Sequence, residues 1–473
     1  MLRFVISAFA VLLCFPSLGN LVAQDATQTT LVHSKKFLDQ KQIDWFKWSG
    51  SKRGDTNCVS CHTNATYLLA RPTIHRAVKN DSSTTLEELL VRNAIKRVGN
   101  WKTNRPYYGG RRADSSRGTE SVINALTLSS YDQMLNRKEP SEETIAALKI
   151  MWSEQKTEGS TQGAWAWLNF NLEPWESKQA EYFGAALAAF AVARTPGNYS
   201  RSEEIKQNLS SLKTYLATPF KQSKLSAYHQ AYLLWVSTEF DGLISREEQK
   251  RIAMNLAKLQ NEDGGWALAK LGKWKRLDDS DAATESDGYA TGLVVNVLLR
   301  VDQNGNKKTL QRGLKWLNDN FDSEKASWIG ISPNVDRSES SDRVKGFMTT
   351  AATALAALAL AENHVRQSSS NSVSQADIEK AKRNVRVYSQ TCKMYRLDVG
   401  KPPKTLESLI HRPKTGNESR LWRGPYLATS KIPHDPWGNP YILKTDPNTN
   451  VSYVFSAGPD GKENTDDDIG RKK

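Results

Sequence analysis

The sequence predicts a mainly α protein in which six pairs of helices close into an (α/α)6 toroid, followed by a small α+β domain. Three observations support this fold class. Alanine-rich apolar segments recur along the first 360 or so residues. Each is preceded by a more polar, amphipathic segment with helical periodicity. The composition then changes after Asn363 to a polar stretch and to a region rich in Pro and Gly.

The apolar segments begin near Cys58, Glu120, Glu181, His229, Asp287 and Thr349, at intervals of about 48 to 62 residues. The amphipathic segments before them cover residues 37–48, 86–98, 141–153, 201–216, 246–260 and 308–320. An open helical array needs polar capping repeats, but here the first and last apolar segments are as apolar as the middle ones. We therefore expect a closed ring, with six inner helices forming a barrel and six outer helices covering it.

The start of the chain predicts export. Arg3 precedes an apolar run over residues 4–16, and small residues follow up to a cleavage point after Ala23, so residues 1–23 read as a signal peptide. No later run reaches the roughly 18 apolar residues of a membrane span. We expect a periplasmic or secreted protein with no transmembrane segment in the mature chain.

The formal net charge of +14 bears on the partners of this chain. An exported protein seldom meets nucleic acid, and no basic run is interleaved with nucleic-acid reading motifs, so we expect no nucleic-acid partner. An anionic envelope surface or an acidic redox protein would suit a basic surface of this kind.

Cys58, Cys61 and His62 form a Cys-x-x-Cys-His motif. Two thiols at this spacing can add to the vinyl groups of haem while the histidine ligates the iron, so we expect covalent haem c at the start of the first inner helix. A Cys58–Cys61 disulfide is the structural alternative. Met348 and His75 are candidates for the distal iron ligand, and an open sixth position is an equal alternative.

The turn before the fifth inner helix carries a family signal. Gln260 ends an amphipathic segment and Trp266 follows a Gly-Gly turn, while weaker copies of the turn end at Gln162 to Trp165 and at Trp328. These turns resemble the Gln/Trp repeat of squalene and hopene cyclases, in which a helix-end Gln binds the following turn and the Trp packs between repeats. Over residues 37–362 the resemblance implies the toroid of terpenoid cyclases and prenyltransferases.

The cyclase activity does not follow from the fold. Hopene cyclases use a carboxylic acid in a DxDD motif, which this chain lacks. Asp278, Asp279 and Asp281 have the wrong spacing and stand in a polar segment, so we expect a solvated turn there. The Asp-rich magnesium motif of diphosphate chemistry is also missing from the sequence.

Four polar residues stand at the expected starts of inner helices: Glu120, Glu181, His229 and Asp287. In a closed ring they would converge on one mouth of the barrel, where they are candidates for a cavity site; Trp175 and Glu176 lie close to the third start. Helix capping explains the carboxylates without a function, and a hydrogen-bonded core histidine explains His229.

A second domain is expected over residues 374–473, after a polar linker at 363–373. Its motifs lie at residues 394–400, 406–409, 422–427, 435–441 and 455–461. In this order they resemble the periplasmic domain of the type II secretion major pseudopilin. Residues 375–388 are too charged for the long apolar N-terminal helix of a pilin, so we expect a docking module instead of a filament subunit.

The pseudopilin resemblance implies a calcium site in the last loop. Carried onto this sequence, the side-chain ligands are Asp460, Asp467 and Asp468, with the Ala457 carbonyl as a further ligand; Asp466 replaces one of them if the alignment shifts by one residue. Hard oxygen ligands in a flexible loop suit calcium. An acidic, solvated tail is the alternative.

Two classes of function stay open at this point. The first is a haem c toroid that transfers electrons or oxidises an apolar molecule held in its cavity, with a calcium-binding docking domain. The second is a non-catalytic scaffold that recognises envelope partners. A divergent terpenoid cyclase-like isomerase is a third reading.

Overall fold

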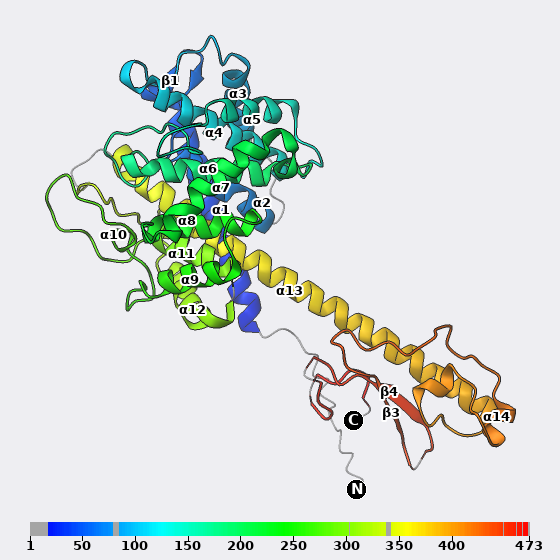
Figure 1. Ribbon diagram of the computed structural model, residues 1–473. Helices are drawn as coiled ribbons and strands as arrows, with labels where there is room; N and C mark the ends of the chain where they lie inside the picture. The colour runs from blue at the N-terminus through cyan, green and yellow to red at the C-terminus, as the bar shows by residue number, and fades with distance from the viewer. Residues whose placement is uncertain are drawn as a thin grey trace, which may run out of the picture. The chain divides into compact units, whose positions relative to one another are not determined.

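The computed structural model describes residues 18–78, 85–301, 303–336, 342–447, 449–459, 461–465 and 467–471. The chain forms two compact units, residues 1–365 and 366–473 (Figure 1). Within the described residues, the strands form two antiparallel pairs: β1 (Lys52–Arg53) with β2 (Thr56–Asn57), and β3 (Ile442–Thr445) with β4 (Ser452–Phe455).

The first unit is built from alternating outer and inner helices, which confirms the predicted fold class. The outer helices are α1 (Leu18–Lys47), α3 (Thr85–Gly99), α5 (Glu142–Ser153), α7 (Lys206–Lys221), α9 (Arg246–Ala257) and α12 (Gln303–Asp319). The inner helices are α2 (Asn64–Ala77), α4 (Ala113–Met134), α6 (Glu181–Arg194), α8 (Ala227–Glu239), α11 (Gly288–Arg300) and the first part of α13 (Asp342–Val399); α10 (Leu268–Leu271) is a short addition. Inner helices have neighbours on every side, which is why they are apolar all round.

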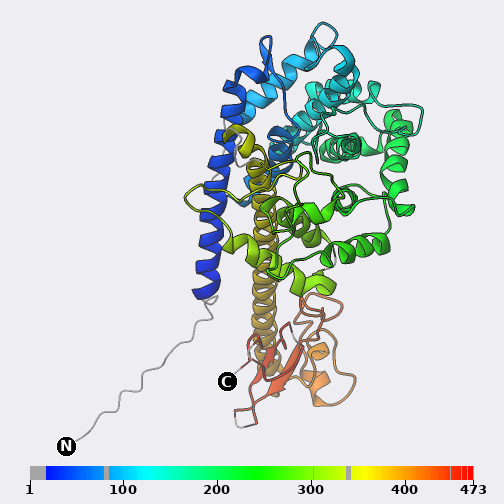
Figure 2. The same cartoon turned by 90° about the vertical axis from the view of Figure 1, so that its left-hand side faces the viewer.

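The inner helices form a closed ring. Each of α2, α4, α6 and α8 contacts the next inner helix along the chain. The backbone of α11 then approaches α13 closely, since a Cβ at Gly292 would clash with the Ala356 nitrogen. Phe347 of α13 in turn stacks on His62, just before α2, with ring centroids 4.1 Å apart. In Figure 2 the blue helix α1 lies beside the first part of α13, in yellow. The side-chain nitrogen of Gln28 in α1 lies 2.9 Å from a ring nitrogen of His364 in α13.

A buried charge network joins the ends of the inner helices. Arg194 of α6 and Arg300 of α11 both pair with Glu239 of α8, at 3.5 and 3.3 Å. Arg300 also pairs with Glu362 of α13 at 3.0 Å. Arg194 donates to the Leu68 carbonyl of α2 at 3.0 Å, so the network links five inner helices.

Three tryptophans connect the turns of the toroid to its outer helices through hydrogen bonds. Each is fully buried, and each indole N–H donates to a carbonyl in or next to the preceding outer helix: Trp165 to Met151 (2.6 Å), Trp266 to Leu256 (2.8 Å) and Trp328 to Leu317 (2.7 Å). Gln260 donates to the Gly264 carbonyl at 2.8 Å and to the Thr309 carbonyl at 2.9 Å, so it ties its own turn to the next repeat.

The first of the three turns differs from the expected pattern. Gln155, and not Gln162, donates to the Gly163 carbonyl and to the Asn208 carbonyl, both at 3.0 Å. The turn between this glutamine and Trp165 is longer than the one between Gln260 and Trp266, which hid the correspondence in the sequence.

The second unit packs around the later part of α13. Its core holds Tyr388, Cys392 and Tyr395 from that helix and Leu409 and Val454 from the rest of the unit, which includes a short α14 (Asn417–Leu421). The stretch 363–373, expected as a linker, is helical and belongs to α13. The helix ends before Gly400, whose φ of 77° suits a residue without a Cβ.

Two further findings concern the expected export and membrane properties of the chain. Residues 18–23 of the expected signal peptide are helical, and its residues 1–17 lie outside the described part of the chain. None of the helices in the described ranges is long and apolar enough to cross a membrane.

Candidate functional site at Cys58 to His62

The Cys-x-x-Cys-His segment lies in the loop between β2 and α2, inside the first unit. The side chains of its two cysteines and its histidine are buried: Cys58 is 6% exposed, Cys61 1% and His62 8%. Polar contacts hold the loop in this place. The Ser60 amide donates to Asn64 Oδ1 at 2.7 Å, and the Asn64 amide donates back to Ser60 Oγ at 3.2 Å. This reciprocal pair fixes the segment on the first turn of α2.

His62 is enclosed by aromatic rings from three separate parts of the unit. Phe347 stacks on it at 4.1 Å, Trp45 stands edge-on at 5.2 Å, and Trp175 lies at 6.0 Å. Burial lowers the pKa of His62 to about 3, so the imidazole is neutral at ordinary pH. Its Nδ1 is hydrogen-bonded to Thr63 Oγ1 at 2.8 Å, which orients the ring and leaves Nε2 as the nitrogen for a ligand.

The two cysteines are free, buried thiols, and the alternative Cys58–Cys61 disulfide is not formed. Burial raises the pKa of Cys58 to about 12 and that of Cys61 well above its ordinary value. Cys61 also forms a hydrogen bond with Glu176. Reactive dithiols and thiolate metal sites need the ionised sulfur, so this environment favours neither.

Glu176 makes the site sensitive to pH. Burial raises its pKa to about 7 from an ordinary value of 4.5, while the hydrogen bond from Cys61 opposes that shift. The folded chain therefore binds this proton more tightly than the unfolded chain, so the free energy of unfolding falls as the pH rises from about 4.5 to about 7.

In haem-free protein, the substitution Glu176→Gln removes the fall in unfolding free energy that ionisation of this carboxyl causes. We expect the free energy of unfolding of the variant, minus that of wild type, to increase by about 1 to 2 kcal/mol as the pH rises across this range. Denaturant unfolding of both proteins at several pH values measures the difference. Glu158→Gln, which changes an exposed side chain, is the control. Its free energy of unfolding should change with pH in the same way as that of wild type. Parallel curves for Glu176→Gln would contradict the assignment.

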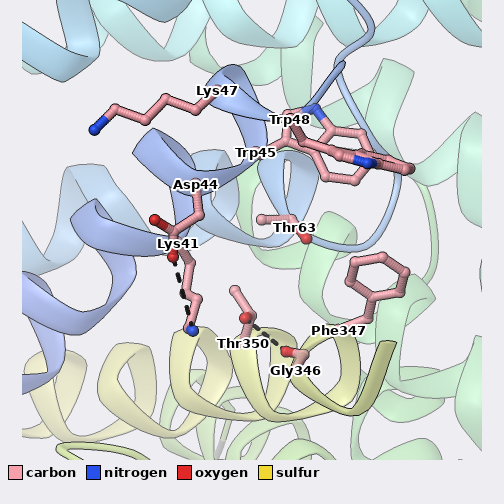
Figure 3. A pocket seen from close by; sticks show the side chains of 9 residues that line it. All are labelled: Lys41, Asp44, Trp45, Lys47, Trp48, Thr63, Gly346, Phe347 and Thr350. Atoms are coloured by element: carbon pink, nitrogen blue, oxygen red, sulfur yellow. Dashed lines mark hydrogen bonds and ion pairs between the residues drawn. The ribbon is translucent and has the colours of Figure 1, made fainter. Parts of the chain in front are cut away.

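A pocket of about 440 Å3 opens beside the motif (Figure 3). Its lining comes from the end of α1, from Thr63 just after the motif and from the start of α13: Lys41, Asp44, Trp45, Lys47, Trp48, Thr63, Gly346, Phe347 and Thr350. Trp45 and Phe347 both contact His62 and line the pocket. The indole N–H of Trp45 also donates to the Cys58 carbonyl at 2.7 Å. Trp45 and Phe347 therefore lie between the motif and the pocket and contact both.

Met348 and His75, the two candidates for the distal iron ligand, lie in different helices. The residue of α13 that contacts the His62 ring is Phe347, and the neighbouring Met348 is 6% exposed with its carbonyl close to Gly330. His75 lies 11 residues into α2 after Asn64, or about 16 Å along the helix axis. That separation excludes His75 as a ligand of an iron held by His62, and the expectation for His75 was wrong.

Two of the four candidate cavity residues have clear partners deep in the unit. Glu120 lies well inside α4, fully buried, and accepts from Arg97 Nε at 2.5 Å. Asp287 caps α11, because its carboxylate accepts the amides of Tyr289 and Ala290 at 2.9 Å and that of Leu268 at 2.7 Å. Burial raises the pKa of Asp287 to about 7. Capping accounts for Asp287. The ion pair with Arg97 satisfies Glu120 Oε1, whereas Glu120 Oε2 has no hydrogen-bond partner among the described residues.

The other two cavity candidates also have structural partners. Glu181 begins α6 and pairs with Lys156 at 2.6 Å. His229 packs on Tyr182, with ring centroids 4.8 Å apart, and its Nδ1 lies 3.2 Å from Ser226 Oγ. Burial lowers the pKa of His229 to about 3, which keeps it neutral.

Aromatic side chains occupy the interior between α8, α11 and the loop before α6. The Tyr289 hydroxyl lies 3.0 Å from those of Tyr228 and Tyr232, and the indole N–H of Trp175 donates to it at 3.1 Å. The three tyrosines are fully buried. They form a hydrogen-bonded cluster inside the first unit.

The acidic turn behaves as the sequence predicts. Asp278, Asp279 and Asp281 are exposed. Asp278 pairs with Arg276 at 3.1 Å and accepts the Asp336 amide at 2.6 Å, so its role is to organise this surface loop.

Among the described residues of the last loop of the second unit, Asp468 has a buried carboxylate with spare acceptor capacity. The Asp468 side chain is 4% exposed; its Oδ2 accepts the Asn464 amide at 2.9 Å, whereas its Oδ1 has no hydrogen-bond partner among the described residues. Asp467 Oδ1 accepts from Thr465 Oγ1 at 2.7 Å, and Ala457 is buried. Asp460 and Asp466 lie outside the described residues.

Comparison with known proteins identifies the second unit. The family description "Type II secretion system (T2SS), protein G" matches residues 369–472. Type II secretion system core protein G of Aeromonas hydrophila is 37% identical over 99 residues, which are 20% of this chain and 68% of that protein. The chain belongs to the type II secretion system protein G family. The matched segment spans 63% of the corresponding Dickeya chrysanthemi protein, also at 37% identity. Membership in this family rests on the second unit.

Solved structures resemble each unit. The major pseudopilin of enterohaemorrhagic Escherichia coli shares 36% identity with 20% of this chain and 87% of its own, at a TM-score of 0.18. A possible member of the GH105 family from Klebsiella pneumoniae covers 77% of this chain and all of its own at 12% identity and a TM-score of 0.46. The type II terpene cyclase MstE from Scytonema covers 72% of this chain and 99% of its own at 12% identity and a TM-score of 0.42.

Proposed function

We propose that this chain is an exported haem c protein that acts in electron transfer in the periplasm or outside the cell. The observation that carries the proposal is the state of the Cys-x-x-Cys-His segment. His62 is neutral and fixed at Nδ1 by Thr63, beside two free thiols and an aromatic pocket. Neutral imidazole is the form that ligates haem iron.

The residues present fit the cofactor. Cys58 and Cys61 would hold haem through thioether bonds, and His62 would supply the axial nitrogen. Haem, when bound, supplies one-electron redox chemistry. Trp45, Trp175 and Phe347 shield His62 from water, and the carboxyl group of Glu176, whose pKa burial raises to about 7, lies next to Cys61.

Electron transfer is preferred over oxidation of an apolar molecule inside the barrel. Fully buried, hydrogen-bonded side chains of Tyr228, Tyr232 and Tyr289 occupy part of the interior, which leaves less room there for such a molecule. The same packing disfavours a cyclase-like isomerase.

The test is to produce the chain with a haem c maturation system and to record its reduced absorbance spectrum and its intact denatured mass. We expect an α band together with a mass increase of one haem. A colourless protein of unmodified mass would contradict the proposal and favour the alternative, a non-catalytic envelope scaffold.

We further propose that the second unit binds calcium and docks the chain to a component of a secretion system. Two observations favour this. The relatives of this unit are core proteins of type II secretion systems. The buried Asp468 also has an oxygen with no partner in the described loop. Asp460, Asp467, Asp468 and the Ala457 carbonyl would hold the ion through hard oxygens.

Calcium should stabilise the second unit. At a hundredfold excess over its dissociation constant, a ligand that binds only the folded state adds about 2.7 kcal/mol to the free energy of unfolding. We expect thermal unfolding of the full chain to shift upward in calcium and to return in chelator. Asp468→Ala should abolish the shift, whereas Glu463→Gln, which changes another acid of the same loop, should keep it. Identical curves for wild type in calcium and in chelator would contradict the site.

A further inference from the structure

The pocket at the end of α1 combines an apolar wall with a basic rim. Trp45, Trp48 and Phe347 lie together on one side in Figure 3, and Lys41 and Lys47 lie on the other. The volume of about 440 Å3 falls within the range of roughly 300 to 1,000 Å3 found for small-molecule sites. The pocket is therefore large enough for a small organic ligand.

The aromatic wall suits a flat, apolar group. Trp48 and Phe347 are half-buried, so part of each ring is open to contact, whereas Trp45 is 8% exposed. The ring of Trp45 stands edge-on to that of Trp48, with centroids 5.3 Å apart, and to that of Phe347, with centroids 6.1 Å apart. These contacts fix the orientation of the rings, which can bind a further aromatic ring by offset stacking or edge-on contact.

The charges of the rim select the sign of the ligand. Among the described residues that line the pocket, the charged ones are Lys41, Lys47 and Asp44, so two cations face one anion. The Lys41 ammonium lies 3.9 Å from the Asp44 carboxylate, and such a pair on an exposed rim is weak, so Lys41 can exchange Asp44 for another anion at little cost. Aromatic faces alone attract cations, but two neighbouring ammonium groups oppose a cationic ligand.

The two hydroxyl groups of the lining already have partners. Thr350 Oγ1 donates to the Gly346 carbonyl at 2.7 Å, and Thr63 Oγ1 is hydrogen-bonded to His62 Nδ1 at 2.8 Å. The strongest polar contacts of a ligand would therefore be made with the two lysines.

We infer that this pocket binds a small aromatic monoanion, an aryl carboxylate or sulfonate, with its ring against the aromatic wall and its anionic group facing Lys41 and Lys47. The site is separate from the Cys-x-x-Cys-His segment, because Trp45 and Phe347 lie between the pocket and His62. The inference therefore does not depend on the attachment of haem.

Calorimetric titration of the full chain with naphthalenesulfonate at low salt tests the inference. Naphthyltrimethylammonium, which has the same rings and the opposite charge, is the control ligand. The variants are Lys41→Gln, Lys47→Gln, both together, and Trp48→Leu. Lys36→Gln is the matched control, because Lys36 is an exposed lysine of the same helix that is not part of the pocket lining. Thermal unfolding shows which variants are folded.

We expect one naphthalenesulfonate per chain and weaker binding of the cation. Each single lysine variant should raise the dissociation constant about two- to fivefold, the double variant should raise it further, and Trp48→Leu should raise it about tenfold. Lys36→Gln should bind as wild type does. Equal dissociation constants in the folded double variant and in Lys36→Gln would overturn the inference. Tighter binding of the cation, or no binding of naphthalenesulfonate, would also overturn it.

Discussion

The double variant Cys58→Ser, Cys61→Ser is expected to contain no covalent haem when it is produced beside a wild-type chain that carries one. Both sulfurs are lost as bonding partners, whereas the serine hydroxyls cannot form thioethers. The measurement is the intact mass after denaturation together with the colour that survives solvent extraction.

Cys392→Ser is the matched control for this effect. Cys392 is equally buried but lies in the core of the second unit, away from His62 in the sequence and in a separate unit. This variant should keep the haem. A chain whose haem content depends on Cys392, or on none of the three cysteines, would show that the Cys-x-x-Cys-His segment is not the attachment site.

The second large effect is expected on stability. Glu239→Ala removes the carboxylate shared by Arg194 and Arg300, which leaves two guanidinium groups close together and partly unpaired. Breaking one side of a buried ionic network costs about 3 to 5 kcal/mol. Chemical unfolding of the full chain, followed by the signal of the first unit, measures the loss.

Two comparisons separate charge from packing in that network. Glu239→Gln keeps the shape and some hydrogen bonds, so its loss should be smaller than that of Glu239→Ala. Glu203→Ala breaks an exposed pair with Lys206, 3.0 Å apart, and should leave stability unchanged within error. If Glu239→Ala unfolded with the same midpoint as Glu203→Ala, the network would have no role in closing the ring.

The helices were predictable because their signal is local. Each inner helix is apolar around its whole circumference and each outer helix on one face, and both patterns stand in the sequence. The turns that end at Trp165, Trp266 and Trp328 could also be predicted, because their signal lies within a few neighbouring residues. The role of Gln155 was missed because the longer turn before Trp165 breaks the spacing set by Gln260.

The site was predictable only in part. Cys58, Cys61 and His62 are adjacent in the chain, so the motif could be read directly. Phe347 could not be placed against His62 from the sequence, since ring closure alone brings these residues together. Glu176 stood out only as a charged residue before the third inner helix, and its bond to Cys61 depends on how the loop before α6 folds back.

The ring closure described above has a consequence for the order of folding. The hydrogen bonds of the three turn tryptophans join residues 10 to 14 positions apart, so each can form within a short stretch of chain. The bond between Gln28 and His364 joins residues 336 positions apart. Contacts between distant residues form slowly, because a long loop must first close. The repeats are therefore expected to assemble from neighbour to neighbour, with the docking of α13 onto α1 and His62 as the last step. Until that step, α2 and α11 present apolar faces to water, and this is the stage at which the chain is most exposed to misassembly.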